Sequence, residues 1–201
     1  MSDLIRALER TLADLASVST GWALVGGLAV SVRSEPRTTR DVDVAIAVAD
    51  DDEAEALVRE FVRMGYGVMG GVEQTETGRL ATMRLLPPVA GSHGALVDFL
   101  FATSGIEAEV CALAEPLEVL DGVVAPVALI GHLIAMKLLS RDDDHRPQDI
   151  IDLRSLILVA TDEDIDLART AARQIESRGF SRGRDLASAL GDALRRFRPT
   201  P

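Results

Sequence analysis

The sequence predicts an α/β (α+β) fold, in which a mixed β-sheet flanked by helices is followed by a C-terminal helical region. Short apolar or alternating runs typical of strands are interleaved with helical patterns up to about residue 126. From residue 127 onward the apolar residues recur at helical spacing. Apolar residues make up 47% of the 201-residue chain and aromatic residues 3%, so the core must be mainly aliphatic. We therefore expect a core over residues 1–126 and a helical region over residues 127–201.

The first part of the chain alternates between helical and extended patterns. Trp22–Val25 is a short apolar run that ends at Gly26-Gly27, which predicts a buried strand and a tight turn. A helix that follows this turn is expected to end before Pro36, because proline cannot continue it. The expected elements are, in order, a helix over 3–17, a strand over 22–25, a helix over 28–33, a strand over 41–48, a helix that begins after 50–52 and ends at Gly65, strands over 66–72, 80–86 and 95–101, and a hairpin over 117–124.

The second part has only helical patterns. Pro147 suits the first turn of a helix, where its missing N–H costs nothing. Thr161 and Asp164 have the spacing of a capping box, in which each side chain accepts a backbone hydrogen bond at the start of a helix. The expected helices cover 127–140, 147–159, 161–179 and a last segment marked by Leu186, Leu190, Leu194 and Phe197.

The charge balance limits the classes of partner. The chain has 21 basic and 32 acidic residues, a formal net charge of −11, and such a surface repels polyanions. We therefore expect no broad nucleic-acid binding. Cys111 is the single cysteine, and the N-terminus lacks the pattern of a signal peptide. The longest nearly apolar stretch, 123–136, is too short to span a bilayer, so we expect a cytoplasmic protein with no membrane partner.

Two aspartates at the start of a strand are the strongest sign of chemistry. In the run Asp41-Val42-Asp43, side chains two apart point to the same side, so both carboxylates share one face. At a separation of about 4 Å and an effective dielectric of about 20, two such charges repel by roughly 4 kcal/mol. A divalent cation removes this penalty, and Mg²⁺ prefers carboxylate oxygens. The pattern therefore predicts a Mg²⁺ site.

Two further features are expected to lie near these aspartates. Gly26-Gly27 ends the preceding strand and can let backbone N–H groups approach a triphosphate. Asp98 lies inside an otherwise apolar strand, where a charge is costly unless it is paired or bound to a metal. Together these residues predict a site with three carboxylates beside a phosphate-binding turn.

The glycine pair, its spacer, the run Thr-Arg-Asp-Val-Asp-Val over residues 38–43 and the later strand aspartate resemble the polymerase-β-like nucleotidyltransferase superfamily. Within it, Lys137 and the run Gln-Asp-Ile-Ile-Asp-Leu over residues 148–153 are similar to the AbiEii-type branch, known as toxins of type IV toxin–antitoxin systems. The resemblance covers about residues 20–155. It implies a nucleotidyltransferase-like sheet with a C-terminal helical region.

The resemblance also implies a role for each residue. Gly26, Gly27, Arg40 and Lys137 would bind the nucleotide, and Asp41, Asp43 and Asp98 would bind a pair of Mg²⁺ ions. Asp98, Lys137 and Asp149 would be the catalytic residues, with Asp149 supporting the site. The reaction would transfer a nucleoside monophosphate from an NTP to an acceptor hydroxyl, such as a tRNA end, and a toxin would have an antitoxin partner.

Other interpretations remain open at this point. The acceptor could be a small cationic molecule, as in aminoglycoside nucleotidyltransferases, and the acidic composition favours this. The chain could also be a non-catalytic nucleotide-binding or interaction module, since Gln148 stands where the branch often has a basic residue. Among single residues, Asp98 could pair with an internal arginine, Lys137 could lie on the surface, and Asp149 and Asp152 could be ordinary acids in the first turn of a helix.

Overall fold

The computed structural model describes residues 3–89, 94–141 and 147–198, which form a mixed α/β fold with seven strands in one sheet and eight helices. The fold class expected from the sequence is confirmed. In chain order the elements are α1 (Asp3–Leu15), β1 (Trp22–Val25), α2 (Gly26–Arg33), β2 (Val42–Ile46), α3 (Asp51–Arg63), β3 (Gly67–Glu73), β4 (Leu80–Leu86), β5 (Val97–Leu100), α4 (Glu107–Ala112), β6 (Glu115–Leu120), β7 (Val123–Val127), α5 (Ile130–Ser140), α6 (Pro147–Val159), α7 (Asp162–Ser177) and α8 (Leu186–Phe197).

The sheet has the strand order β3-β4-β5-β2-β1-β7-β6. The pairs β2–β5 and β1–β7 are parallel, and the other neighbouring strands are antiparallel. Strands β5, β2 and β1 at the centre are short and almost fully buried, which fits their apolar sequences. The aspartates predicted to bind metal therefore lie on, or directly beside, the most protected strands of the sheet.

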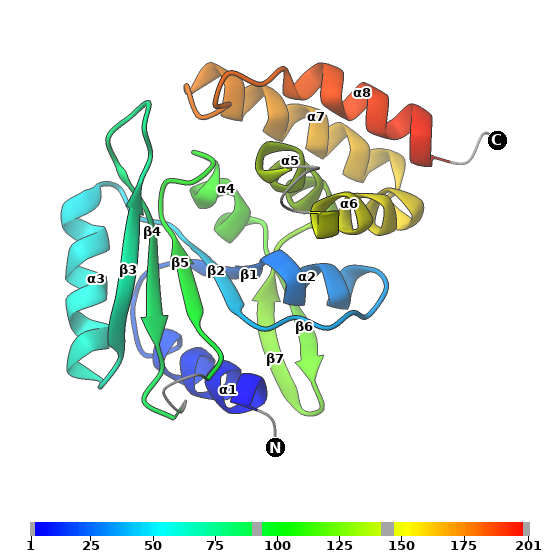
Figure 1. Ribbon diagram of the computed structural model, residues 1–201. Coiled ribbons are helices and arrows are strands. Elements are labelled where there is room, and N and C mark those ends of the chain that lie inside the picture. Colours follow the sequence, from blue (N-terminus) through cyan, green and yellow to red (C-terminus); the bar gives the residue numbers. More distant parts are fainter. Residues whose placement is uncertain (1–2, 90–93, 142–146, 199–201) are drawn as a thin grey trace.

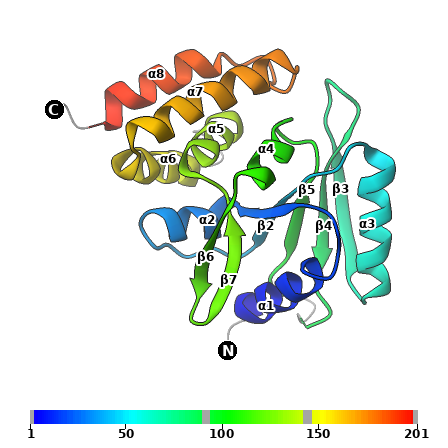
Figure 2. The ribbon, with the colours of Figure 1, turned by 180° about the vertical axis from the view of Figure 1, so that it is seen from behind.

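The helices lie in separate groups around the sheet (Figures 1 and 2). Helices α5–α8 gather at one end of the molecule, α3 lies beside β3 and β4, and α1 lies at the other end. Helix α5 contacts α6, α7 and α8 and also touches α2, which follows the first strand of the sheet. The four C-terminal helices thus come close to the end of the sheet where α2 begins.

Most expected elements are present, with shifted ends. The strands Trp22–Val25 and Leu80–Leu86 and the helix Pro147–Val159 have the expected bounds. The capping box is confirmed, because the side chains of Thr161 and Asp164 each accept the backbone N–H of the other. The helix expected over 28–33 begins earlier, at Gly26, because no loop separates it from β1.

The short helix α4 was not predicted from the sequence. Its first residue is Glu107, whose Oε1 accepts hydrogen bonds from the backbone N–H and the hydroxyl of both Thr103 and Ser104, in the preceding loop, at 2.7–2.9 Å. These hydrogen bonds join the loop after β5 to the first turn of the helix. Glu107 is buried, and periodicity does not identify a side chain with this role. Over the described residues, no helix is long and apolar enough to cross a membrane.

Candidate active site

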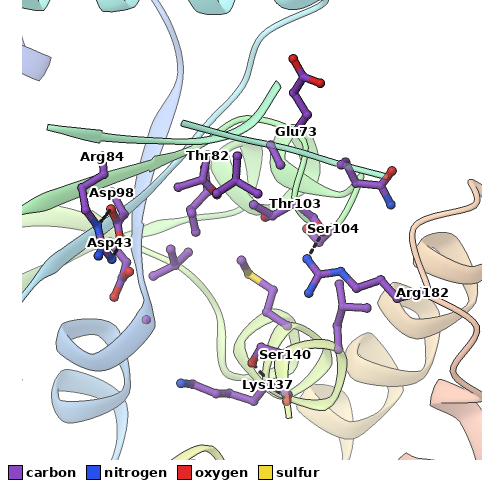
Figure 3. Close-up of a pocket in the computed structure, with 18 of the residues that line it drawn as sticks. Asp43, Glu73, Thr82, Arg84, Asp98, Thr103, Ser104, Lys137, Ser140 and Arg182 are labelled. Carbon is purple, nitrogen blue, oxygen red and sulfur yellow. Dashed lines mark hydrogen bonds and ion pairs between the residues drawn. The ribbon is translucent and has the colours of Figure 1, made fainter. Parts of the chain in front are cut away.

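The register of the sheet places four residues side by side on neighbouring strands. Arg84 on β4 pairs with Asp98 on β5, Asp98 pairs with Asp43 on β2, and Asp43 pairs with Val25 on β1. Residues that are directly opposite on neighbouring strands face the same side of a sheet. Asp98 therefore has a carboxylate on one side and a guanidinium on the other. Figure 3 shows Arg84, Asp98 and Asp43 together on one wall of a cavity.

Arg84 holds Asp98 through two hydrogen bonds. Its Nε lies 2.7 Å from Oδ1 of Asp98, and its Nη2 lies 2.6 Å from Oδ2. This is the bidentate geometry in which an arginine binds a carboxylate most strongly. The hydrogen bonds raise the pKa of the Arg84 guanidinium further above its ordinary value, and the charges of Asp98, Asp41 and Asp43 add to the shift. The sequence left open a pairing of Asp98 with an internal arginine; Asp98 does pair with an arginine, but Arg84 is exposed.

The carboxyl group of Asp43 has a raised pKa. Burial, and after it the negative charge of Asp98, raise the pKa of Asp43 to about 6. Lys137 and the backbone N–H of Gly27 act in the opposite direction. Asp41 directly precedes β2, and its Oδ1 lies 3.4 Å from the backbone N of Leu96. The wall is therefore rich in negative charge that one arginine does not offset.

The two glycines allow α2 to begin directly against Asp43. Gly26 has a φ of 60°, in the left-handed region, and a Cβ on it would lie 2.0 Å from Oδ2 of Asp43. A Cβ on Gly27 would lie 2.7 Å from Oγ1 of Thr39 and 2.8 Å from Nη2 of Arg37. Side chains at either position would thus collide with the groups around the site. The sequence requires glycine here because the backbone itself lines the cavity.

The opposite wall comes from the helical region and is led by Lys137 on α5. Its Nζ lies 2.7 Å from Oδ1 of Asp149 and 2.9 Å from Oδ2 of Asp152, both on α6. Ser140 donates a further hydrogen bond to Oδ2 of Asp149 at 3.1 Å. The Lys137 side chain is 14% exposed, and both acids are buried. Lys137 is therefore not a surface lysine. Asp149 does lie in the first turn of α6, but it and Asp152 are buried and paired with Lys137.

Arg37, in the segment between α2 and β2, also binds Asp152 and so joins the network of Lys137, Asp149 and Asp152. Its Nε lies 2.6 Å from Oδ1 of Asp152 and its Nη2 lies 2.7 Å from Oδ2. Burial raises the pKa of Asp152, but the hydrogen bonds from Arg37 and Lys137 outweigh burial and leave that pKa below its ordinary value. Asp152 stays ionised and joins the segment that precedes β2 to helices α5 and α6. This network fixes where the helical wall stands relative to the sheet wall.

The two walls enclose a cleft with two chambers. The larger, about 800 Å³, is lined by Gly26, Asp43, Arg84, Asp98, Lys137 and Asp149 and extends past Glu73, Thr103 and Arg182. The smaller, about 360 Å³, is lined by Gly27, Arg37, Arg40, Asp41, Asp43, Asp98 and Lys137. Figure 3 shows Lys137 and Ser140 across the larger chamber from Asp43. Four basic residues line the smaller chamber, since Arg84 joins Arg37, Arg40 and Lys137 there, and this makes it the more suitable place for phosphate groups.

The structure brings all eight residues predicted for the site to this cleft. They are Gly26, Gly27, Arg40, Asp41, Asp43, Asp98, Lys137 and Asp149. Arg84 and Asp152 were not predicted for the site from the sequence. A signal existed for Arg84, which is the single charged residue of an otherwise uncharged strand. A signal for Asp152 also existed, since it follows Asp149 at helical spacing.

The residues present fit a divalent cation in part. Asp41 and Asp43 provide carboxylate oxygens at a place where negative charge accumulates, as Mg²⁺ requires. Asp98 adjoins Asp43, but its oxygens are engaged by Arg84. As arranged, no three Asp, Glu, His or Cys side chains among the described residues converge on one metal position. A cation held by Asp41 and Asp43 thus fits the observed arrangement, whereas a cation held by Asp98 requires Arg84 to move.

Comparisons with known proteins identify a matching family. Residues 6–200 match the protein-family model described as "Nucleotidyl transferase AbiEii toxin, Type IV TA system". No curated protein matches the sequence.

Solved structures resemble the chain at low identity. A nucleotidyltransferase-like antigen from Paracoccidioides brasiliensis is 20% identical, with a TM-score of 0.48 over 92% of this chain and 93% of that one. A putative nucleotidyltransferase from H. pylori is 15% identical, with a TM-score of 0.46 over 96% and 92%. ANT(2'')-Ia in complex with adenylyl-2''-tobramycin is 16% identical, with a TM-score of 0.48 over 96% and 98%.

Proposed function

The chain belongs to the AbiEii nucleotidyl transferase family, and we propose that it transfers a nucleoside monophosphate from an NTP to an acceptor hydroxyl in the cleft between Asp43 and Lys137. In this reaction the acceptor oxygen forms a bond to the α-phosphorus, and the bond from that phosphorus to the pyrophosphate oxygen breaks. Residues 1–126 would form the nucleotidyltransferase core, and residues 127–201 would form the helical wall of the cleft.

One observation carries the proposal: a wall of three carboxylates faces a partly buried lysine across a cavity large enough for a nucleotide. Divalent cations, when bound, would activate the acceptor hydroxyl and neutralise charge on the phosphates. Asp41 and Asp43 would hold the cation, and Asp98 would bind the cation that contacts the acceptor hydroxyl. This arrangement suits phosphoryl chemistry, in which positioning and charge provide most of the catalysis.

The basic residues would bind the triphosphate. An ammonium has three N–H donors, and Asp149 and Asp152 accept two of those of Lys137, so the third can serve a phosphate oxygen. Arg37 and Arg40 line the smaller chamber on the same side as Gly27. Asp149 would hold the Lys137 ammonium in place, so that it offsets charge that develops on the leaving pyrophosphate.

For the acceptor, we favour a macromolecular end such as that of a tRNA, because the matching family is described as a toxin. The same description supports a neutralising antitoxin as a partner. A small cationic acceptor is the second candidate. It is favoured by the net charge of −11 and by Glu73 and Glu76, which line the larger chamber away from Asp43. An acceptor screen with tRNA and with aminoglycosides separates the two.

Calorimetric titration of each NTP in the presence of Mg²⁺ tests the proposal. The wild type should bind at least one NTP, and the double variant Asp41→Asn, Asp43→Asn should lose the Mg²⁺-dependent part of binding. The matched control is Asp162→Asn, Asp192→Asn, which removes the same charge from side chains that are 85% and 65% exposed. A folded wild type that binds no NTP would overturn the proposal. NTP binding without pyrophosphate release to any acceptor would favour the non-catalytic module instead.

A further inference from the structure

Arg84 has a position on the sheet wall that the proposed reaction does not explain. It is the one basic side chain in the cross-strand row, next to the carboxylate that the reaction assigns to the acceptor side. We propose that Arg84 is a positioning residue that competes with a divalent cation for Asp98, so that Asp98 enters the cation site only when Arg84 releases it. This inference rests on the proposed function, because it concerns the same cleft.

The geometry of the ion pair makes the competition direct. Both Asp98 oxygens receive an N–H of the same guanidinium, at 2.7 and 2.6 Å. The pair thus offsets the carboxylate charge that would attract a cation. The guanidinium also places a positive charge where a cation would approach Asp98, and two like charges repel strongly at this range. A cation bound at Asp98 and the present Arg84 conformation therefore disfavour each other.

The difference in exposure between the partners shows which one can move. The side chain of Asp98 is 11% exposed, whereas that of Arg84 is 47% exposed. Asp98 is on a central strand, while Arg84 is on the neighbouring strand toward the sheet edge and lines both chambers of the cleft. The half-exposed guanidinium has room to turn into the cleft or into solvent once its two hydrogen bonds to Asp98 are broken, whereas the buried Asp98 must stay. The ion pair is therefore expected to open by movement of the Arg84 side chain away from Asp98.

Within the described residues Arg84 makes no hydrogen bond to the other two carboxylates, so only its charge acts on them. Asp41 and Asp43 lie on the far side of Asp98 from Arg84, and Asp43 receives its hydrogen bond from the backbone N–H of Gly27. A first cation can bind there with Arg84 in place. Cations would thus bind in two steps. The position at Asp41 and Asp43 is available while Arg84 holds Asp98, and the position that includes Asp98 becomes available when Arg84 releases it.

The test measures Mn²⁺ affinity from the signal of free Mn²⁺ in electron paramagnetic resonance, without nucleotide. The variant Arg84→Gln should bind Mn²⁺ roughly tenfold more tightly than the wild type, a difference of about 1.4 kcal/mol. The variant Arg84→Lys keeps the charge but loses the bidentate geometry, so it should fall between them. Arg59→Gln removes the same charge from an exposed pair with Glu55 and should leave the affinity within about twofold.

The gain must depend on Asp98 if the inference is right. Arg84→Gln combined with Asp98→Asn should bind Mn²⁺ no more tightly than Asp98→Asn alone. A gain in affinity cannot come from general damage to the fold, which would weaken binding. The inference is overturned if Arg84→Gln binds Mn²⁺ like the wild type or more weakly, or if its gain persists without Asp98.

The same measurement separates failure of this inference from failure of the proposed function. If Mn²⁺ and NTP bind in a manner that depends on Asp43 but Arg84→Gln has no effect, only the role of Arg84 is overturned. If neither the wild type nor Arg84→Gln binds Mn²⁺ with or without NTP, both fail.

Discussion

The two walls of the cleft differ in how their charges are balanced. On the helical wall, Asp149 and Asp152 are matched by Lys137 and Arg37, and both acids are buried. On the sheet wall, Asp41, Asp43 and Asp98 face one guanidinium, so three negative charges and one positive charge leave a formal charge of −2. The helical wall is complete as it stands, whereas the sheet wall needs further positive charge.

This difference indicates that the helical wall fixes the geometry of the cleft, whereas the sheet wall binds the cation and the nucleotide. A buried network whose partners satisfy one another fixes geometry, and removing one member leaves an uncompensated charge. On a wall with excess negative charge the carboxylates repel one another, and a bound divalent cation reduces this repulsion. Substitutions on the helical wall should therefore act mainly on stability, and substitutions on the sheet wall mainly on cation and nucleotide binding.

The largest effect on stability is expected for Asp152→Asn on the helical wall. The change leaves Arg37 and Lys137 without the buried carboxylate that both bind. Breaking such a pair costs roughly 3–5 kcal/mol of unfolding free energy. Urea denaturation measures the loss. Asp162→Asn removes the exposed partner of Arg198 and should cost less than about 1 kcal/mol. Equal losses in the two variants would remove the distinction between the walls.

On the sheet wall, removing the charge of Asp43 should raise the free energy of unfolding at neutral pH, whereas Asp152→Asn lowers it. Burial raises the pKa of Asp43 to about 6 from an ordinary value of 3.8, so the folded state binds this proton more tightly than the unfolded state. Between about pH 4 and pH 6 the unfolded state releases the proton first, and metal-free stability falls as the pH rises. At pH 7 the ionised Asp43 costs the fold roughly 3 kcal/mol.

Asp43→Asn should therefore unfold at a higher urea concentration than the metal-free wild type at pH 7. The advantage should shrink as the pH falls toward 4, because Asp43 is then increasingly neutral in both states of the wild type. Unfolding curves at several pH values in the presence of a chelator measure this. A variant that is less stable than the wild type at pH 7 would show that Asp43 is already well compensated and would contradict the idea of an incomplete wall.

A smaller stability effect, about 1–2 kcal/mol, is expected for Gly26→Ala. The new Cβ would collide with Oδ2 of Asp43, and the residue would keep a φ of 60°. Gly122→Ala is the matched control, because Gly122 has a φ of 74° and a Cβ added there would meet no atom within 4 Å. In both variants the positive φ should lower the free energy of unfolding by a similar amount. Only Gly26→Ala should lose Mg²⁺-dependent NTP binding in calorimetry. Retained binding would mean that Asp43 does not need this close approach.

The sequence predicted the sheet wall better than the helical wall. Asp41 and Asp43 were found because alternation along a strand is a local pattern, and Asp98 because a charge inside an apolar run is conspicuous. Lys137 and Asp149 came from a family resemblance. Their burial depends on how α5 and α6 pack against the core, which no local pattern encodes.

The partners of these residues were harder to predict because pairing depends on register and on long-range contacts. Arg84 meets Asp98 only because β4 and β5 are antiparallel with those two residues opposite each other. A shift by one residue would turn Arg84 to the other face of the sheet. Arg37 meets Asp152 across a separation of 115 residues. Helix α4 was missed for a related reason, since it has six residues and its buried Glu107 carboxylate binds the preceding loop, which gives no periodic signal.

Pyrophosphate release is the most direct test of the reaction at the sheet wall. It would be measured for the wild type, Asp43→Asn and the control Asp192→Asn, with Mg²⁺, the NTP that binds, and tRNA or an aminoglycoside as acceptor. We expect release by the wild type and the control, and a loss of at least about a thousandfold in folded Asp43→Asn, as for removal of a group central to the transition state. Release by Asp43→Asn at the wild-type rate would contradict the assignment of this wall as the site of nucleotidyl transfer.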